Sequence, residues 1–217
     1  MNYFNRIKIA VSNYTAEFDK AKQAYDNNEK VIKANYTGAL FAQKYGELKT
    51  AFQELTAPMQ QTAEAEVVNA LIELKQHIQK IVTQPCPAEV ISTIELLKSA
   101  ADVTQDECRM YFKQFKGNYT ARKVLGDFIE ARHGMDFFLE VWRGSANLLD
   151  GKSQPVKLEE LLADLNSVER EALNCIRNYT KLNAAQSGWY QVANFLSFKM
   201  LDRVETDFNT FINGFDT

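Results

Sequence analysis

The longest regular pattern in the chain is a heptad of apolar residues near the N-terminus. Apolar side chains recur at alternating steps of three and four residues, interrupted by Asn28, at Phe4, Ile7, Val11, Tyr14, Phe18, Ala21, Tyr25 and Ile32. This spacing puts them on one face of a helix and predicts a partner helix, in this chain or in another. Asparagine at a core heptad position helps to fix the register of such a pair. The pattern predicts packing and not a particular chemistry.

A second apolar seam follows in a different register. It runs through Phe41, Tyr45, Leu48, Phe52 and Leu55. Two interpretations fit the break in register: one helix of about fifty residues with a discontinuity, or a turn near residues 35–38. We favour the continuous helix because the break contains no proline and good helix formers surround it. Residues 56–58, which include a proline, predict the end of this helix and the start of the next.

A third stripe predicts that the long helix folds back as a hairpin. Its members are Val67, Leu71, Leu74, Ile78 and Ile81, and a Pro-Cys-Pro segment at residues 85–87 ends it. Two apolar stripes joined by a short connection favour antiparallel packing. X-Pro bonds force extended backbone, so 85–87 is the expected boundary between a hairpin at 1–84 and a bundle at 88–217. A single continuous domain is the alternative.

The rest of the chain predicts shorter helices. A capping box, Thr104 with Glu107, opens one of them, and Asn118 is a candidate start for another. The expected spans are 88–100, 104–116, 119–149, 156–182 and 189–213. Only four prolines and nine glycines occur in the chain, which suits helices better than many tight turns. We therefore predict an all-α protein of about seven helices without a convincing strand.

Composition narrows the possible partners. The net charge is −3, and lysine and arginine are scattered among aspartate and glutamate. This distribution argues against a nucleic-acid face and against a membrane-binding surface, both of which need clustered cations. No apolar run reaches the roughly eighteen residues of a membrane span, and no signal peptide is evident. Three cysteines without CxxC spacing indicate reduced thiols. We expect a cytoplasmic protein.

Candidate chemistry is weak throughout the sequence. Glu130 and His133 have the Glu-x-x-His spacing that di-iron bundle proteins use twice, but the second copy is missing here. The structural alternative is a histidine that is half-buried or paired with Glu130. Glycine-rich phosphate loops and an activated cysteine or serine are also missing. We therefore expect no catalytic residues, no cofactor and no metal, with Glu130 and His133 as weak metal candidates.

The tripeptide Asn-Tyr-Thr occurs four times, beginning at Asn13, Asn35, Asn118 and Asn178. Each copy matches an N-glycosylation acceptor. We instead expect helix packing or capping, because Tyr14 belongs to the apolar stripe. An internal duplication is the alternative, although the copies have no fixed spacing.

Aromatic residues suggest how the protein acts. The chain holds fourteen Phe, nine Tyr and two Trp, and several of them follow residue 189. These C-terminal aromatics exceed what one helix face can bury, so they form either an exposed docking face or a segment that wraps back over the bundle.

We expect a non-enzymatic protein-protein interaction or adaptor protein that acts through heptad and aromatic surfaces, with a protein partner or self-association. The expected interaction residues are Phe4, Val11, Phe18, Tyr25, Trp189, Phe208, Phe211 and Phe215. A viral or phage structural or assembly protein is the first alternative. A bundle-type metal-binding protein or enzyme is the second.

Overall fold

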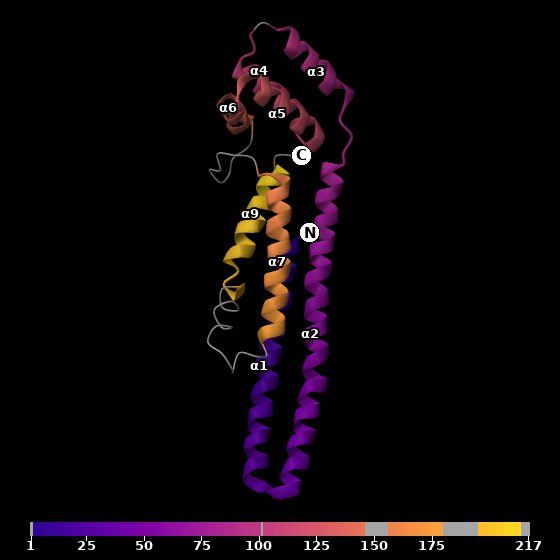
Figure 1. Ribbon diagram of the computed structural model, residues 1–217, viewed down its shortest axis with the longest axis vertical. Helices are drawn as coiled ribbons and strands as arrows, with labels where there is room; N and C mark the ends of the chain where they lie inside the picture. The colour runs from indigo at the N-terminus through magenta and orange to yellow at the C-terminus, as the bar shows by residue number, and fades with distance from the viewer. Residues whose placement is uncertain (1, 101, 146–155, 180–194, 214–217) are drawn as a thin grey trace. The chain divides into compact units, whose positions relative to one another are not determined.

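The computed structural model describes residues 2–100, 102–145, 156–179 and 195–213. Within these residues it contains eight helices and no strand, which confirms the all-α prediction (Figure 1). The helices are α1 (Tyr3–Asn35), α2 (Gly38–Val82), α3 (Ala88–Ser99), α4 (Gln105–Gln114), α5 (Tyr119–His133), α6 (Met135–Ser145), α7 (Leu158–Tyr179) and α9 (Lys199–Asn213).

The chain forms two compact units, and each unit combines segments that are distant in sequence. The first unit comprises Met1–Glu73 and Leu165–Asp202, and the second comprises Leu74–Asp164 and Arg203–Thr217. They differ from the segments 1–84 and 88–217 expected above. The division of the chain into domains stays a prediction.

The N-terminal hairpin is confirmed, but its turn lies where the less favoured interpretation put it. α1 ends at Asn35 and α2 begins at Gly38, so the expected continuous helix is wrong. The backbone N–H of Tyr36 donates to the carbonyl of Ile32 (3.0 Å), and the Asn35 side chain donates to the carbonyl of Val31 (2.9 Å). Gly38 has a φ of +57°, a conformation that glycine adopts without the steric cost of a Cβ atom.

The expected helix end at residues 56–58 is also wrong. α2 is continuous from Gly38 to Val82 and contains Pro58 in its interior. Proline there lacks an N–H donor and disfavours a helix. Packing on both sides explains why the helix continues, because Phe52 lies against Phe18 of α1 (5.7 Å between ring centroids) and Ala63 is buried.

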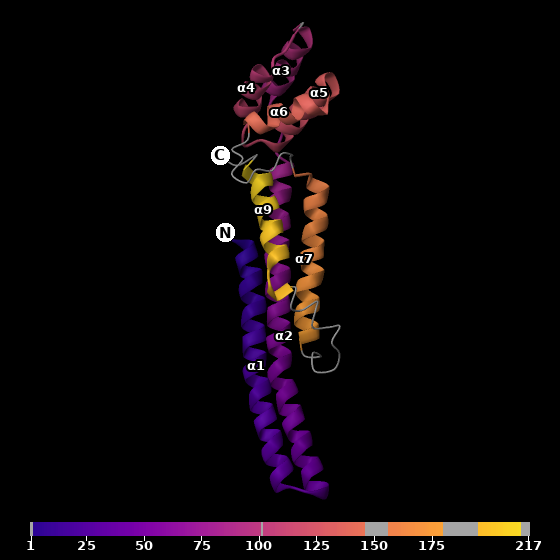
Figure 2. The ribbon, with the colours of Figure 1, turned by 90° about the vertical axis from the view of Figure 1, so that its left-hand side faces the viewer.

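The core of the first unit forms where α1, α2 and α7 meet. Arg6 of α1 bonds to Glu73 of α2 (2.6 Å), so the two helices run antiparallel, as Figures 1 and 2 show. Tyr179 of α7 lies beside Phe18 (5.7 Å between ring centroids), and its hydroxyl donates to Asp19 (2.9 Å). The predicted stripe is buried inside the chain at Phe4, Ile7, Val11, Tyr14, Phe18 and Ala21.

The second unit has its own apolar core, built mainly by α3, α4, α5 and α6. Its buried members include Val90, Leu97, Cys108, Phe112, Leu125, Ile129, Val141 and Trp142. The capping box at the start of α4 is present, since Thr104 Oγ1 accepts from the Glu107 N–H and the Glu107 carboxylate accepts from the Thr104 N–H.

Two expected helices of this part of the chain are each interrupted within their described residues. The span 119–149 is divided at Gly134, whose φ of +86° ends α5 and precedes α6. The span 189–213 is interrupted at residues 197–198: residues 195–196 are helical, Phe198 has a positive φ of 55°, α9 begins at Lys199, and residues 189–194 lie outside the described residues.

The third Asn-Tyr-Thr copy has the capping role predicted for it. Asn118 Oδ1 accepts from the Ala121 N–H at the start of α5 (2.8 Å), and Asn118 Nδ2 donates to the carbonyl of Pro85 (3.0 Å). The Thr120 hydroxyl donates to the carbonyl of Gln84 (2.6 Å). This copy therefore holds the segment before α3 against the start of α5.

Replacing Asn118 should test this role. We expect Asn118→Ala to destabilise the second unit by about 1–2 kcal/mol, the usual cost of losing an N-cap together with a side-chain hydrogen bond. Asn118→Asp keeps the oxygen that accepts the N-cap hydrogen bond, so it should lose less stability than Asn118→Ala. Thermal unfolding of the three proteins measures the difference. Equal melting temperatures for the wild type and Asn118→Ala would contradict the proposed role.

Candidate functional site

The hairpin tip, defined here as residues 22–62, is the longest segment without a buried side chain among the described residues of the first unit. The last buried residue of α1 is Ala21, and the first buried residue of α2 is Ala63. The last described residue of α7, Tyr179, contacts Tyr14 and Phe18. Figures 1 and 2 show α1 and α2 continuing past this point to their turn. Two helices alone leave much of an apolar seam open to water.

Aromatic side chains form the seam of the hairpin tip. The Tyr25 and Phe52 rings lie 4.9 Å apart, and Phe41 stacks on Tyr45 at 5.7 Å. A hydrogen bond between the Tyr25 and Tyr45 side chains raises the pKa of Tyr25 to about 12. All four rings are partly exposed, and a hollow of about 600 Å³ lies beside Tyr25 and Phe52.

Apolar side chains other than these four rings extend this surface. Val31, Leu40 and Leu55 are 56%, 49% and 51% exposed. Charges are nearly balanced, since the tip contains five lysines and four carboxylates. Several pair along their own helix, including Lys33 with Glu29 and Lys44 with Glu47. The hairpin tip is thus an apolar and aromatic surface with little net charge.

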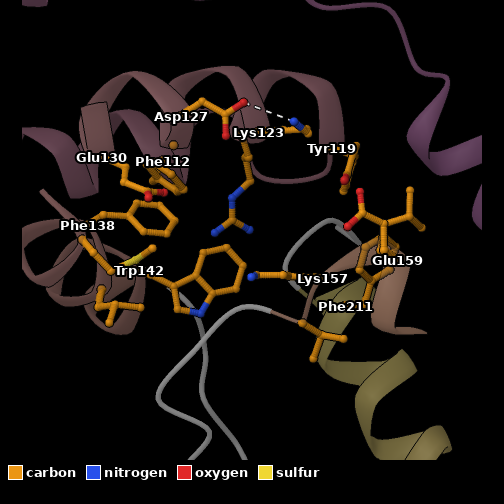
Figure 3. A pocket seen from close by; sticks show the side chains of 16 residues that line it. Phe112, Tyr119, Lys123, Asp127, Glu130, Phe138, Trp142, Lys157, Glu159 and Phe211 are labelled. Atoms are coloured by element: carbon orange, nitrogen blue, oxygen red, sulfur yellow. Dashed lines mark hydrogen bonds and ion pairs between the residues drawn. The ribbon is translucent and has the colours of Figure 1, made fainter. Parts of the chain in front are cut away.

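The second unit contains a cavity of about 460 Å³, which we call the Arg122 pocket (Figure 3). Its walls come from five elements: Phe112 from α4, Arg122 from α5, Phe138 and Trp142 from α6, the segment 156–159 at the start of α7, and Phe211 from α9. Gly126 of α5 allows a close approach, because a Cβ atom there would lie 3.1 Å from Phe138.

Arg122 is a charged residue in an apolar environment. It is 3% exposed, and its Cζ lies 5.2 Å from the centroid of the Phe112 ring and 4.9 Å from that of Trp142. Burial lowers the pKa of Arg122 to about 10, so the guanidinium remains a cation at neutral pH. Cation–π interactions with the two rings offset part of the desolvation cost.

The other ionisable groups of the pocket lie around this cation. Lys123 pairs with Asp127 (3.2 Å), the dashed contact in Figure 3. The Lys157 ammonium points toward the Trp142 ring, whereas the Glu159 carboxylate lies near Tyr119. The pocket lining thus contains three cations, Arg122, Lys123 and Lys157, and the carboxylates of Asp127, Glu130 and Glu159, with Arg122 over the Trp142 ring.

The two weak metal candidates, Glu130 and His133, have different surroundings in the described part of the chain. Glu130 lines the Arg122 pocket, while the His133 ring stacks on Phe137 at 4.6 Å and 23°. Among the described residues, no group of three or more His, Cys, Asp or Glu side chains is placed to hold a metal ion.

The expected interaction residues fall into three classes. Phe4, Val11, Phe18, Phe208 and Phe211 are buried inside the chain, Tyr25 is partly exposed at the hairpin tip, and Trp189 and Phe215 lie outside the described residues. The exposed docking face expected at Phe208 and Phe211 is not present in this structure. Their contact with a partner stays a prediction.

Sequence reasoning missed Arg122. A single arginine in a helix usually lies on the exposed face. Its spacing could have predicted burial, because Leu125 and Ile129 follow at three and seven residues and therefore lie on the same face of the helix as Arg122.

Comparison with known proteins gives no direct indication of function. No family model, no curated protein and no solved structure matches the chain. Among the described helices, none combines the length and apolar character needed to cross a membrane.

Proposed function

We propose that this is a non-enzymatic interaction protein that contacts helical partners through its hairpin tip, and that a second copy of the chain is one such partner. The observation that carries the proposal is the partly exposed aromatic seam on a pair of helices. The cytoplasmic location and the adaptor role expected from the sequence belong to the same proposal.

Packing geometry supports association at this surface. A pair of amphipathic helices buries only the line along which the helices touch, and further helices cover the rest in a bundle. Tyrosine and phenylalanine at the tip are residue types enriched at interfaces. A second hairpin would supply two helices with the same seam and form a four-helix arrangement.

Charge also favours a second copy as partner. Like-charged surfaces repel one another, and the cost rises with net charge. The hairpin tip has five lysines and four carboxylates, so two tips meet without a large repulsion. Coiled-coil partners use such mixed charges to set orientation.

The test replaces exposed apolar residues at the tip. We expect the wild type to show a mass that rises with concentration in light scattering. The double variant Val31→Lys/Leu55→Lys should weaken this association by at least about tenfold. In the complex, the second copy would cover these two apolar side chains, and lysine would place a charge in each contact. Both residues are exposed, so the melting temperature should change little.

A matched control is available on α3. Ile91 and Leu96 are exposed to a similar degree but lie outside the hairpin tip. The variant Ile91→Lys/Leu96→Lys should associate like the wild type. A wild type that remains monomeric at every concentration would contradict self-association, and equal effects of the two double variants would contradict the tip as its site. A mass that continues to rise beyond a dimer would favour the assembly-protein alternative.

A further inference from the structure

The Arg122 pocket has no part in an interaction through the hairpin tip. All of its lining residues belong to the second unit. Its volume of about 460 Å³ lies within the range of small-molecule sites, roughly 300–1,000 Å³. Such sites combine apolar walls with a few convergent polar groups.

The walls of the pocket suit a flat apolar group. Phe138 and Trp142 present their rings from α6, and Leu139 and Met135 of the same helix complete this side. Aromatic rings stack on other flat groups in offset or edge-to-face arrangements. The apolar part of a ligand would rest against α6.

The pocket lining contains both cations and carboxylates. Lys123 and Asp127 neutralise each other by pairing. Arg122 lies over Trp142, and Lys157 points toward the same ring in Figure 3. Glu130 and Glu159 also line the pocket, and Glu159 lies near Tyr119. The Arg122 guanidinium and the Lys157 ammonium are therefore both directed at the Trp142 ring.

Arginine in such a setting recognises particular anions. The guanidinium group is planar and can present paired N–H donors to a carboxylate or a phosphate. The Phe112 and Trp142 rings hold Arg122 in place, so little side-chain entropy would be lost on binding. In a partly dehydrated cavity, the attraction between opposite charges is stronger than in water.

We propose that the Arg122 pocket binds a small organic anion, with its carboxylate or phosphate at Arg122 and Lys157 and a flat apolar body against Phe138 and Trp142. Glu130 and Glu159 restrict where the anionic group lies, because either carboxylate repels it. This assignment gives the second unit a ligand-binding role in addition to the proposed interaction role of the first unit.

Four probes of similar shape test the charge requirement by isothermal titration calorimetry. They are 2-naphthoate, 2-naphthyl phosphate, the neutral 2-naphthamide and the cationic 2-naphthylmethylammonium. We expect at least one anion to bind, and the neutral and cationic probes to bind at least about tenfold more weakly. The relative affinity of naphthoate and naphthyl phosphate identifies the preferred anionic group. Equal binding of the amide and the anions, or no binding of either anion at millimolar concentration, would overturn the proposal.

Substitutions locate the site. Arg122→Met keeps a long side chain while removing the charge, and it should weaken anion binding by at least about tenfold. Lys157→Gln changes an exposed residue outside the core and should weaken anion binding by about threefold or more. Lys113→Met, on an exposed position of α4 outside the pocket, is the control and should bind like the wild type. If Arg122→Met fails to fold, Lys157→Gln decides, and its unchanged anion affinity would contradict this site.

Discussion

Phe18→Asp is expected to unfold the first unit. Phe18 is buried between α1, α2 and α7, with its ring 5.7 Å from both Phe52 and Tyr179. The substitution removes a large apolar side chain, which costs about 3–5 kcal/mol. It also places a carboxylate in an apolar site, which adds a further cost of several kcal/mol. The sum approaches the whole stability of a typical domain, about 5–15 kcal/mol. Circular dichroism with urea unfolding measures the loss.

Ala16→Asp is the control for this prediction. Ala16 is an exposed residue of the same helix, so the variant adds the same charge without removing a core contact. It should keep nearly all of the wild-type stability, apart from the lower helix propensity of aspartate, about 0.7 kcal/mol. Similar unfolding midpoints for the two variants would show that the Phe18 face of α1 does not form a core.

Phe211→Ala is expected to destabilise the second unit by about 3–5 kcal/mol, the usual cost of deleting a buried phenylalanine side chain. Phe211 is 2% exposed, and its ring lies 5.5 Å from that of Tyr119. This result differs from the one that an exposed docking face predicts, namely weaker association with little change in melting. Differential scanning calorimetry of the variant measures the effect.

Met110→Ala provides the comparison. Met110 is an exposed apolar residue of α4 in the same unit, and surface substitutions of this kind usually change stability by less than about 0.5 kcal/mol. If Phe211→Ala melts like Met110→Ala, Phe211 contributes little to the core. Weaker self-association of such a stable Phe211→Ala variant would restore the docking interpretation.

Local sequence patterns predicted the buried face of α1 and the starts of α4 and α5 correctly. The heptad from Phe4 to Ala21 is buried as its spacing indicated, and the Thr104 capping box and the Asn118 cap both form. Each of these features depends on residues within a few positions of one another. Their geometry follows from the helix period and from hydrogen bonds at a helix end.

Local sequence patterns did not predict several helix boundaries. A proline usually favours a helix start, yet α2 runs through Pro58 because Phe52 and Ala63 are held on either side of it. The turn before Gly38 was one of two possible outcomes, because glycine allows a left-handed conformation without requiring one. Glycine composition alone likewise did not show that Gly134 divides α5 from α6.

The sequence by itself determined the helical class, the apolar face of α1 and most helix starts, because each depends on short-range periodicity and capping. Only the tertiary structure decided that the stripe is closed within the chain up to Ala21 and is partly open at the hairpin tip. It also brought Arg122 together with Phe112 and Trp142 from three different helices. The physical reason is that burial depends on which surfaces meet in space, and a residue's own neighbours in the chain do not specify those surfaces.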